Sequence, residues 1–366
     1  MPLAGSFRGV FKNGKNAWNF QVWLLSFGSL RASKADAQFQ INSRVRCTEM
    51  LGMSIQKQDK GSQVAILLCT YNGEKHLQTQ LNSIAKQTYK DWAVYASDDG
   101  SVDNTKKILH EFSASHPEHR VEIYDGPQEG FAKNFYSLLQ RKEVIGDYYA
   151  FCDQDDVWDV NKLEIAVGHM LRIGERVPAL VCGRTRYVNN DLQQIGCSPL
   201  FEKKPSFRNA LVQSIAGGNT ILINNSARRL VCMVSKKRKI VSHDWMCYLI
   251  VSASGGVIYY DPIPHIGYRQ HEFNLVGANS SVKERIARLK GLFKGTFKEW
   301  NELNLELLAD VLSEMHVENK KIFEYFCRSR RSFYPGSLYY ALKSGVYRQT
   351  VFGNIGLAVA YLLRKI

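Results

Sequence analysis

The sequence lacks an apolar run of the roughly 20 residues that a membrane-spanning helix requires. Its longest N-terminal run, residues 22–25, is too short and too far into the chain for the apolar region of a signal peptide. We therefore expect a cytoplasmic protein, which could still rest on a membrane surface.

Cysteines are scattered, and none of the eight forms a C-x-x-C pair. Most lie in apolar surroundings, where a reduced thiol packs as a small hydrophobic side chain. This pattern argues against a disulfide scaffold and favours a reducing compartment.

Acidic residues are in the minority, because 34 Asp and Glu oppose 48 Lys and Arg and give a formal net charge of +14. A basic chain attracts phosphate-bearing small molecules, nucleic acid or an anionic membrane. Charge alone does not choose among these partners.

The sequence does contain enough apolar side chains for a large core, since 45% of its 366 residues are hydrophobic. Residues 1–62 show no sustained helix or strand period, so we predict an N-terminal extension that is poorly ordered or dispensable. Beyond it, short apolar runs that predict strands alternate with amphipathic segments that predict helices; the runs begin at Val64, Trp92, Val121 and Asp147. This alternation predicts an α/β fold with a mostly parallel sheet flanked by helices.

Polar loops follow three of the predicted strands, at residues 70–74, 97–103 and 153–156. Ligands of such sheets bind beyond the carboxyl ends of the strands, so we expect the three loops to meet. The last loop, "DQDD", places Asp153 and Asp155 two positions apart. Bunched carboxylates repel one another unless a cation or hydrogen-bond donors offset the repulsion, and Mg²⁺ or Mn²⁺ prefers such oxygens. The alternative is an acidic loop that caps a helix near Val160.

Two more acidic motifs favour a binding site. "SDDG" places Asp98 at a second strand end, where its carboxylate could accept a hydrogen bond from a base or a ribose, or could simply shape the turn. "HDWM", residues 243–246, supplies Asp244 beside a tryptophan that could wall a sugar pocket.

Together, "TYNGE", "SDDGSVDNT", "GFAKNF", "DQDDVW", "GGNT", "HDW" and "YRQHEFNLVG" resemble, in sequence and spacing, the family 2 glycosyltransferases with the GT-A fold. The nearest relatives look like bacterial rhamnosyltransferases that build surface polysaccharide. The resemblance implies a GT-A catalytic domain over residues 63–280 and a place at the cytoplasmic face of the inner membrane.

The resemblance also implies roles for individual residues. Those that would hold the nucleoside are Thr70, Tyr71, Asn72 and Asp98, with assistance from Glu74. A divalent metal, Mg²⁺ or Mn²⁺, would be held by Asp153 and Asp155, with Asp155 the more direct ligand. Asp244 would be the catalytic base. Asn134 would lie near the diphosphate or the sugar. Arg269 and His271 would contact the diphosphate, or would serve as structural hydrogen-bonding groups.

Two positions depart from the family pattern. The family often has a second tryptophan after "DW", whereas this chain has Met246. The "Q-x-x-R-W" motif of cellulose-synthase-like relatives is absent, and "YRQH" at residues 268–271 stands near the corresponding place. The wall of the acceptor pocket is therefore expected to differ.

Residues 281–366 predict a basic, amphipathic helical region. From residue 328 to the end there are seven Lys or Arg and no acidic residue. The apolar segment 351–363 would be about 20 Å long as a helix, which is too short to cross a bilayer. It therefore predicts either a helix lying in the membrane interface or an ordinary helix packed on the catalytic body.

The resulting hypothesis is an inverting glycosyltransferase with Asp244 as base. It would move a sugar, with rhamnose the first candidate, from a dTDP- or UDP-linked donor to a saccharide or lipid-linked acceptor. A nucleotidyltransferase is less favoured, because "TYNGEKH" lacks the expected glycine-rich phosphate loop. A nucleic-acid-binding module is less favoured because no RNP, zinc or helix-turn-helix signature is present, so no nucleic-acid partner is expected. A membrane or assembly protein without activity is the third class, but all three key carboxylates are present.

Overall fold

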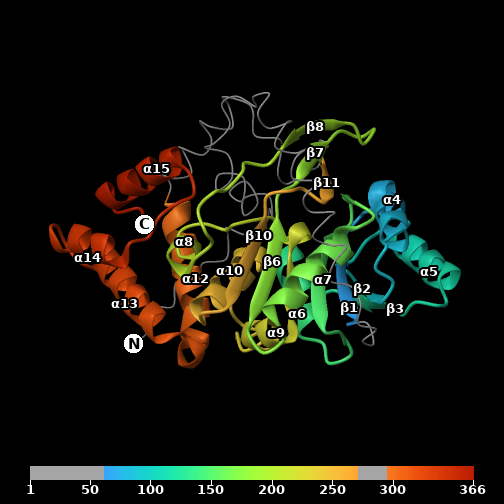
Figure 1. Cartoon of the computed structure of the whole chain (residues 1–366), viewed down its shortest axis with the longest axis horizontal. Helices are drawn as coiled ribbons and strands as arrows, with labels where there is room; N and C mark the ends of the chain where they lie inside the picture. The colour runs from blue at the N-terminus through green and yellow to red at the C-terminus, as the bar shows by residue number, and fades with distance from the viewer. Residues whose placement is uncertain (1–61, 271–294) are drawn as a thin grey trace, which may run out of the picture.

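The computed structural model describes residues 62–270 and 295–366 (Figure 1). The predicted N-terminal extension, the segment "SVKERIARLKGLFK", His271 and the predicted domain boundary near residue 280 therefore lie outside the described residues.

The centre of the molecule is a seven-stranded sheet in the order β10-β6-β9-β4-β1-β2-β3. Its strands are β1 Val64–Thr70, β2 Trp92–Asp98, β3 Val121–Asp125, β4 Tyr148–Asp153, β6 Ala179–Gly183, β9 Leu222–Asn224 and β10 Val257–Asp261. All neighbours pair in parallel except β9, which is antiparallel to β4 and β6. The predicted α/β class is confirmed.

Helices cover both faces of this sheet, and β1 shows why. Val64, Ile66 and Leu68 point into one apolar cluster, whereas Ala65 and Leu67 point into another. Successive side chains of a strand face opposite sides, so a strand buried on both faces must be apolar throughout. The first cluster includes side chains of α4 Glu74–Ala85, α5 Thr105–Ser115 and α7 Lys162–Ile173; the second includes those of α6 Phe131–Leu139, α9 Asn225–Val231 and α10 His243–Ala253.

A second, four-stranded sheet in the order β5-β11-β7-β8 lies near the top of Figure 1. Its strands are β5 Val157–Trp158, β7 Arg186–Val188, β8 Gln194–Cys197 and β11 Ile266–Arg269. Since β5 directly follows the "DQDD" loop and pairs with β11, this sheet brings the "YRQ" segment next to the acidic loop. The short helices α8 Phe207–Ala210 and η1 Gly218–Thr220 complete this half of the chain.

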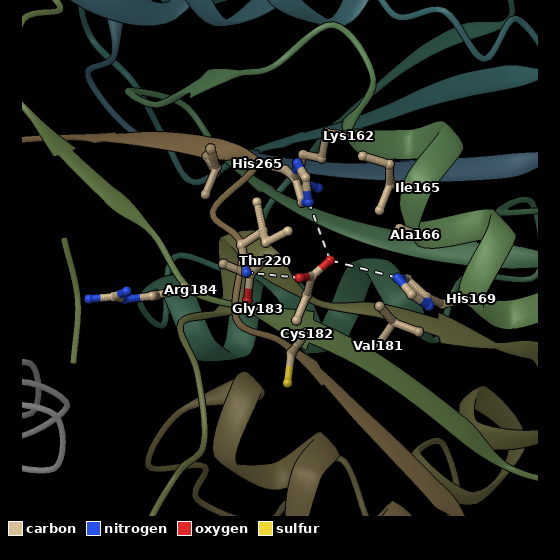
Figure 2. Close-up of a pocket in the computed structure, with 13 residues that line it drawn as sticks. Lys162, Ile165, Ala166, His169, Val181, Cys182, Gly183, Arg184, Thr220 and His265 are labelled. Atoms are coloured by element: carbon tan, nitrogen blue, oxygen red, sulfur yellow. Dashed lines mark hydrogen bonds and ion pairs between the residues drawn. The ribbon is translucent and has the colours of Figure 1, made fainter. Parts of the chain in front are cut away.

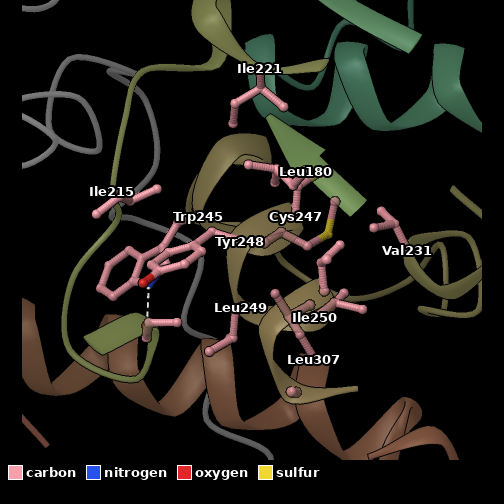
Figure 3. Packing of buried hydrophobic residues seen from close by; sticks show 14 of the residues in the cluster. Leu180, Ile215, Ile221, Val231, Trp245, Cys247, Tyr248, Leu249, Ile250 and Leu307 are labelled. Carbon is pink, nitrogen blue, oxygen red and sulfur yellow. Dashed lines mark hydrogen bonds between the residues drawn. The ribbon is translucent and has the colours of Figure 1, made fainter. Parts of the chain in front are cut away.

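The C-terminal helices are α12 Thr296–Asp310, η2 Leu312–Glu314, α13 Val317–Arg331, α14 Gly336–Ser344 and α15 Val351–Leu362. They share a core with the catalytic body, because Phe297, Leu307 and Leu308 of α12 belong to the same buried cluster as α10. Figure 3 shows Leu307 beside Leu249 and Ile250, with the Trp245 indole donating to the Ala210 carbonyl at 2.7 Å. No helix in the described part of the chain has the length and apolar character needed to cross a membrane.

The sequence suggests Asn72 or Thr70 as the N-cap of α4 and a start of α5 near Ser101, and both predictions were wrong. The N-cap of α4 is Gly73, and the backbone amides of Gly73 and Glu74 donate to the side chains of Thr105 and Asp103. Helix α5 begins at Thr105 rather than near Ser101, because Ser101 hydrogen-bonds to Asp98 within the preceding loop. Both differences arise from contacts between loops that are distant in sequence.

Candidate active site

The first two loops meet through a buried hydrogen bond at the end of the sheet. In the β1–β2 register Thr70 lies opposite Asp98, and the Thr70 hydroxyl donates to Asp98 Oδ1 at 2.9 Å. Ser101 adds a backbone N–H at 2.9 Å, and Lys106 lies 3.8 Å from Asp98 Oδ2. Asp98 therefore holds the two loops together, while its predicted contact with a nucleoside stays a prediction.

Residues 71–74 are fixed mainly through their backbone. Asn72 has a φ of 47°, in the left-handed region, and its side chain accepts from Val102 N at 2.9 Å. The backbone N–H of Tyr71 donates to Gln154 Oε1 at 2.9 Å, and Gln154 Nε2 donates to the Tyr71 carbonyl at 3.0 Å. Tyr71 is nevertheless 58% exposed. Glu74 accepts from Asn104 N at 2.9 Å. A rigid backbone with an exposed aromatic ring is suited to stacking against a planar ligand.

The third loop carries the carboxylate cluster. Asp153 ends β4, beside Cys69 of β1. Burial raises the pKa of Asp153 to about 8, with further upward contributions from the charges of Asp155 and Asp244. The charges of two residues from different motifs thus act on Asp153.

Asp156 is a member of this cluster that the sequence did not single out. Its side chain is fully buried, accepts from Asn219 Nδ2 at 2.6 Å, and also accepts from Arg269 N at 3.4 Å. Burial, then the charges of Asp155 and Asp153, raise the pKa of Asp156 well above its usual range. The motifs "DQDD" and "GGNT" contain both Asp156 and its partner Asn219, but the sequence does not indicate which aspartate of "DQDD" is buried.

Arg269 supports the acidic loop from β11. It is 3% exposed, and its guanidinium donates to the carbonyls of Asp155, at 3.0 Å, and Asn190, at 2.7 Å. Burial lowers the pKa of Arg269. These bonds hold the backbone that carries Asp155; contact with a diphosphate remains a prediction.

Asp244 occupies the first turn of α10, where the helix dipole favours a carboxylate. The residue is fully buried, and Oδ1 accepts from Trp245 N at 2.6 Å. Oδ2 has no hydrogen-bond partner within residues 62–270 and 295–366. Burial raises the pKa of Asp244 to about 6. A buried carboxylate with one open oxygen and a pKa near neutrality has the properties of a general base.

His243, the neighbour of Asp244, was not predicted as a site residue. Its ring packs against Phe135 and Phe151, and neither ring nitrogen has a hydrogen-bond partner among the described residues. Burial lowers the pKa of His243 to about 3, so the ring is neutral. A Cβ on Gly218 would lie 2.1 Å from His243 Nε2, which explains why this position of "GGNT" is a glycine.

Asn134 lies on α6, next to the carboxyl end of β2. It accepts from the Ser97 hydroxyl at 2.6 Å and donates to the Ser97 carbonyl at 3.0 Å. Its amide therefore ties α6 to β2, and its predicted place near the diphosphate or sugar stays a prediction.

Comparison with known proteins identifies the domain. Residues 65–229 match the family model described as Glycosyl transferase family 2. These residues therefore match a family 2 glycosyltransferase domain. The match includes Thr70, Asp98, Asp153 and Asp155 but ends before Asp244. The predicted GT-A fold is confirmed, with its mostly parallel sheet flanked by helices and its helical C-terminal region.

The chain is similar to dTDP-rhamnosyl transferase RfbG of Shigella flexneri, with 29% identity over 267 residues, covering 70% of this chain and 88% of the relative. It is also similar to the UDP-Glc:alpha-D-GlcNAc-diphosphoundecaprenol beta-1,3-glucosyltransferase WfgD of Escherichia coli, with 36% identity over 109 residues, covering 30% of this chain and 41% of the relative. Among solved structures, TarS 1-349 of S. aureus in complex with UDP is 15% identical, covering 77% of this chain and 75% of that one, with a TM-score of 0.47.

The donor set is compatible with the divalent metal that the family implies. No group of three His, Cys, Asp or Glu with metal-binding geometry occurs in the described part of the chain. Mg²⁺ and Mn²⁺ sites that share their shell with substrate phosphates need only one or two protein carboxylates, however. Asp153 is a candidate ligand, because burial first and the charges of Asp155 and Asp244 second raise its pKa, and a bound cation would favour its charged form.

A second buried carboxylate, that of Asp261, lies in a pocket between α7 and the ends of β6 and β10 (Figure 2). Here Asp261 Oδ2 lies 3.2 Å from His265 Nε2 and 3.7 Å from His169 Nε2, while Oδ1 accepts from Ile263 N at 2.9 Å. Burial alone would raise the pKa of Asp261, but the hydrogen bonds from His169 and His265 lower it well below its usual range. The carboxylate is satisfied by the protein itself, so we assign it a structural role.

Proposed function

We propose that the protein is an inverting glycosyltransferase that moves a sugar from a nucleoside diphosphate sugar to a hydroxyl of a saccharide or a lipid-linked saccharide. The observation that carries the proposal is Asp244, a buried carboxylate with one open oxygen whose charge acts on Asp153. A site with separated acidic groups suits single displacement, since one group can face the leaving diphosphate and another the incoming alcohol.

The proposed reaction balances without a covalent enzyme intermediate. The acceptor oxygen forms a bond to the anomeric carbon while the bond from that carbon to the diphosphate oxygen breaks. The acceptor proton passes to Asp244 Oδ2, and the nucleoside diphosphate leaves with the bonding electron pair. One displacement inverts the anomeric centre. A positioned base of this kind typically contributes ~10²–10⁴-fold to the rate.

The loop residues are proposed to orient the donor. The exposed ring of Tyr71 offers a surface for the base, and the Thr70–Asp98 pair fixes the loop beneath it. Asp153 and Asp155 would hold Mg²⁺ or Mn²⁺, which when bound neutralises charge on the diphosphate. Arg269 would then act by keeping the Asp155 backbone in place.

The sugar and acceptor are proposed from the relatives. The Shigella flexneri relative is named for dTDP-rhamnose, so rhamnose from a dTDP donor is the first candidate and UDP-linked sugars are the next. The Escherichia coli relative is named for an acceptor linked to diphosphoundecaprenol. Such an acceptor would sit at a membrane, in keeping with the basic C-terminal region of this chain.

The decisive experiment is a donor screen that measures released nucleotide from a panel of dTDP- and UDP-sugars with Mn²⁺ or Mg²⁺. We expect acceptor-dependent release from one donor, loss of that release in Asp244→Asn, and wild-type release in the surface control Glu318→Gln. Turnover by Asp244→Asn at the wild-type rate would remove Asp244 from the base role.

The metal assignment has its own test by calorimetry. Asp155→Ala should abolish the part of dTDP or UDP affinity that depends on Mn²⁺, and EDTA should have the same effect on the wild type. If EDTA left nucleotide affinity unchanged, the proposed metal site would be wrong.

A further inference from the structure

The last two helices leave an unusual amount of apolar surface exposed. Among the described residues, 23 large apolar side chains are exposed, and ten of them lie between residues 333 and 363. The set consists of Phe333, Tyr334, Leu338, Tyr339, Leu342, Val351, Phe352, Ile355, Leu362 and Leu363. Apolar surface concentrated in this way marks an interaction site rather than ordinary surface variation.

Helix α15 is apolar on both sides. Its inner side packs Leu357 and Tyr361 into the core. Its outer side presents Val351, Phe352, Ile355 and Leu362, each between 55% and 74% exposed. The helix contains no charged residue. Its outer side therefore prefers an apolar environment to water, although 12 residues span only about 18 Å and cannot cross a bilayer.

Basic side chains stand beside the exposed aromatic rings of the same region. The guanidinium of Arg364 lies 4.8 Å from the ring centre of Phe333, and the Lys343 ammonium lies 5.7 Å from that of Tyr339. Phe333 precedes α14 and Arg364 follows α15, so this contact joins the two helices at one end of the molecule, opposite α4 and α5 in Figure 1. Aromatic rings with neighbouring cations suit the boundary between lipid tails and headgroups.

The charges favour an anionic lipid surface over a second copy of this chain. Residues 328–366 contain no acidic residue, and four of their seven basic residues are exposed, namely Arg328, Arg331, Lys343 and Arg364, whereas Arg348 is buried. Two such surfaces facing each other would repel, whereas an anionic bilayer would attract them. We infer that the outer face of α14 and α15, with Lys343 and Arg364, docks the protein on the surface of an anionic membrane. This goes beyond glycosyl transfer, since docking requires no turnover.

The test is sedimentation of the full-length protein with phosphatidylcholine vesicles that contain 0 or 30% phosphatidylglycerol. We expect binding to the anionic vesicles only. Lys343→Gln/Arg364→Gln should weaken it by roughly 25-fold, since each basic residue near such a surface contributes about a factor of five. Phe352→Ser/Ile355→Ser should weaken it by at least about tenfold through lost apolar burial.

Control variants distinguish a role of this surface in docking from unfolding and from the loss of exposed apolar side chains elsewhere. Val160→Ser/Leu171→Ser removes two exposed apolar side chains from the other half of the chain and should bind like the wild type. Thermal melts show whether each variant is folded. Asp244→Asn should still bind vesicles, so loss of transfer and loss of docking can be told apart.

Three results would overturn the inference. The first is equal binding to vesicles with and without phosphatidylglycerol, or none to either. The second is full binding by folded Phe352→Ser/Ile355→Ser, which would leave only non-specific attraction by positive charge. The third is a wild-type dimer that becomes a monomer in that variant while no form binds vesicles, which would make the face a contact between copies.

Discussion

Asp244 and Asp261 are both buried aspartates in one domain, yet their surroundings shift their pKa values in opposite directions. Asp261 is surrounded by donors, including two histidines, and its pKa is lowered. Asp244 keeps one oxygen without a partner in the described part of the chain, and burial raises its pKa to about 6. A buried carboxylate whose oxygens all have hydrogen-bond donors serves a structural role. A buried carboxylate with one oxygen left open stores free energy that a reaction can use.

The largest expected effect concerns Asp244. Asp244→Asn should lower kcat by at least ~10²-fold, because the amide cannot accept the acceptor proton. The same variant should be more stable than the wild type at pH 8, by roughly 3 kcal/mol, since a carboxyl with a pKa of about 6 is penalised when it ionises. Initial rates measure the effect on kcat, and thermal melts measure the effect on stability. A variant that is both inactive and less stable would contradict the contrast drawn between Asp244 and Asp261.

The next effect concerns Asp261. Asp261→Ala should destabilise the protein by about 3 kcal/mol, or roughly 6–12 °C in Tm, because His169 and His265 lose their acceptor. Activity per folded molecule should stay near that of the wild type. A large fall in kcat without a fall in Tm would contradict the structural role.

The pH dependence of stability sharpens the contrast. A lowered carboxyl pKa contributes stability that is present above pH ~4 and is lost as the pH falls below it. The stability difference between Asp261→Ala and the wild type should therefore shrink below pH 4. For Asp244→Asn the difference should shrink as the pH falls from about 6 to about 4, because the carboxyl takes up its proton in the folded wild type before it does so in the unfolded chain. Chemical denaturation across pH 3–8 measures both.

Catalysis should show the same titration. With Asp244 as base, log kcat/KM should rise with slope one on the acidic side and level off near pH 6. If kcat/KM did not change between pH 5 and 8, Asp244 would not be the catalytic base.

The smallest effect concerns Asp156. Asn219→Ala removes the donor to this buried carboxyl and should cost ~1–3 kcal/mol of stability. Since Asp156 adjoins Asp155, a modest loss of metal-dependent nucleotide affinity should accompany it. Unchanged stability would show that Asp156 does not need this partner.

The sheet was predictable from sequence because β1 to β4 are short, apolar and separated by helical periods. The strand-end rule then placed Thr70, Asp98 and Asp153 together, as the β1 register bears out. The structure also links Asp244 to Asp153, although these residues are far apart in the chain.

Other features of the site and of the C-terminal helices could not be predicted, because they depend on tertiary contacts that a local sequence pattern does not show. Asp156 and Asp155 are adjacent and chemically identical, and only packing against Asn219 decides which is buried. The neutral state of His243 likewise follows from two phenylalanine rings supplied by other elements. For residues 351–363 the sequence left two options open, and the structure shows one side of α15 packed in the core.

Helix α10 carries Asp244 in its first turn and packs against α12. A chimera that joined residues 62–270 to a foreign C-terminus would remove Phe297, Leu307 and Leu308 and expose the apolar side chains of α10 that pack in the same cluster. The C-terminal helices therefore support the helix that carries Asp244, so donor preference is better transplanted by exchanging loops than by exchanging halves.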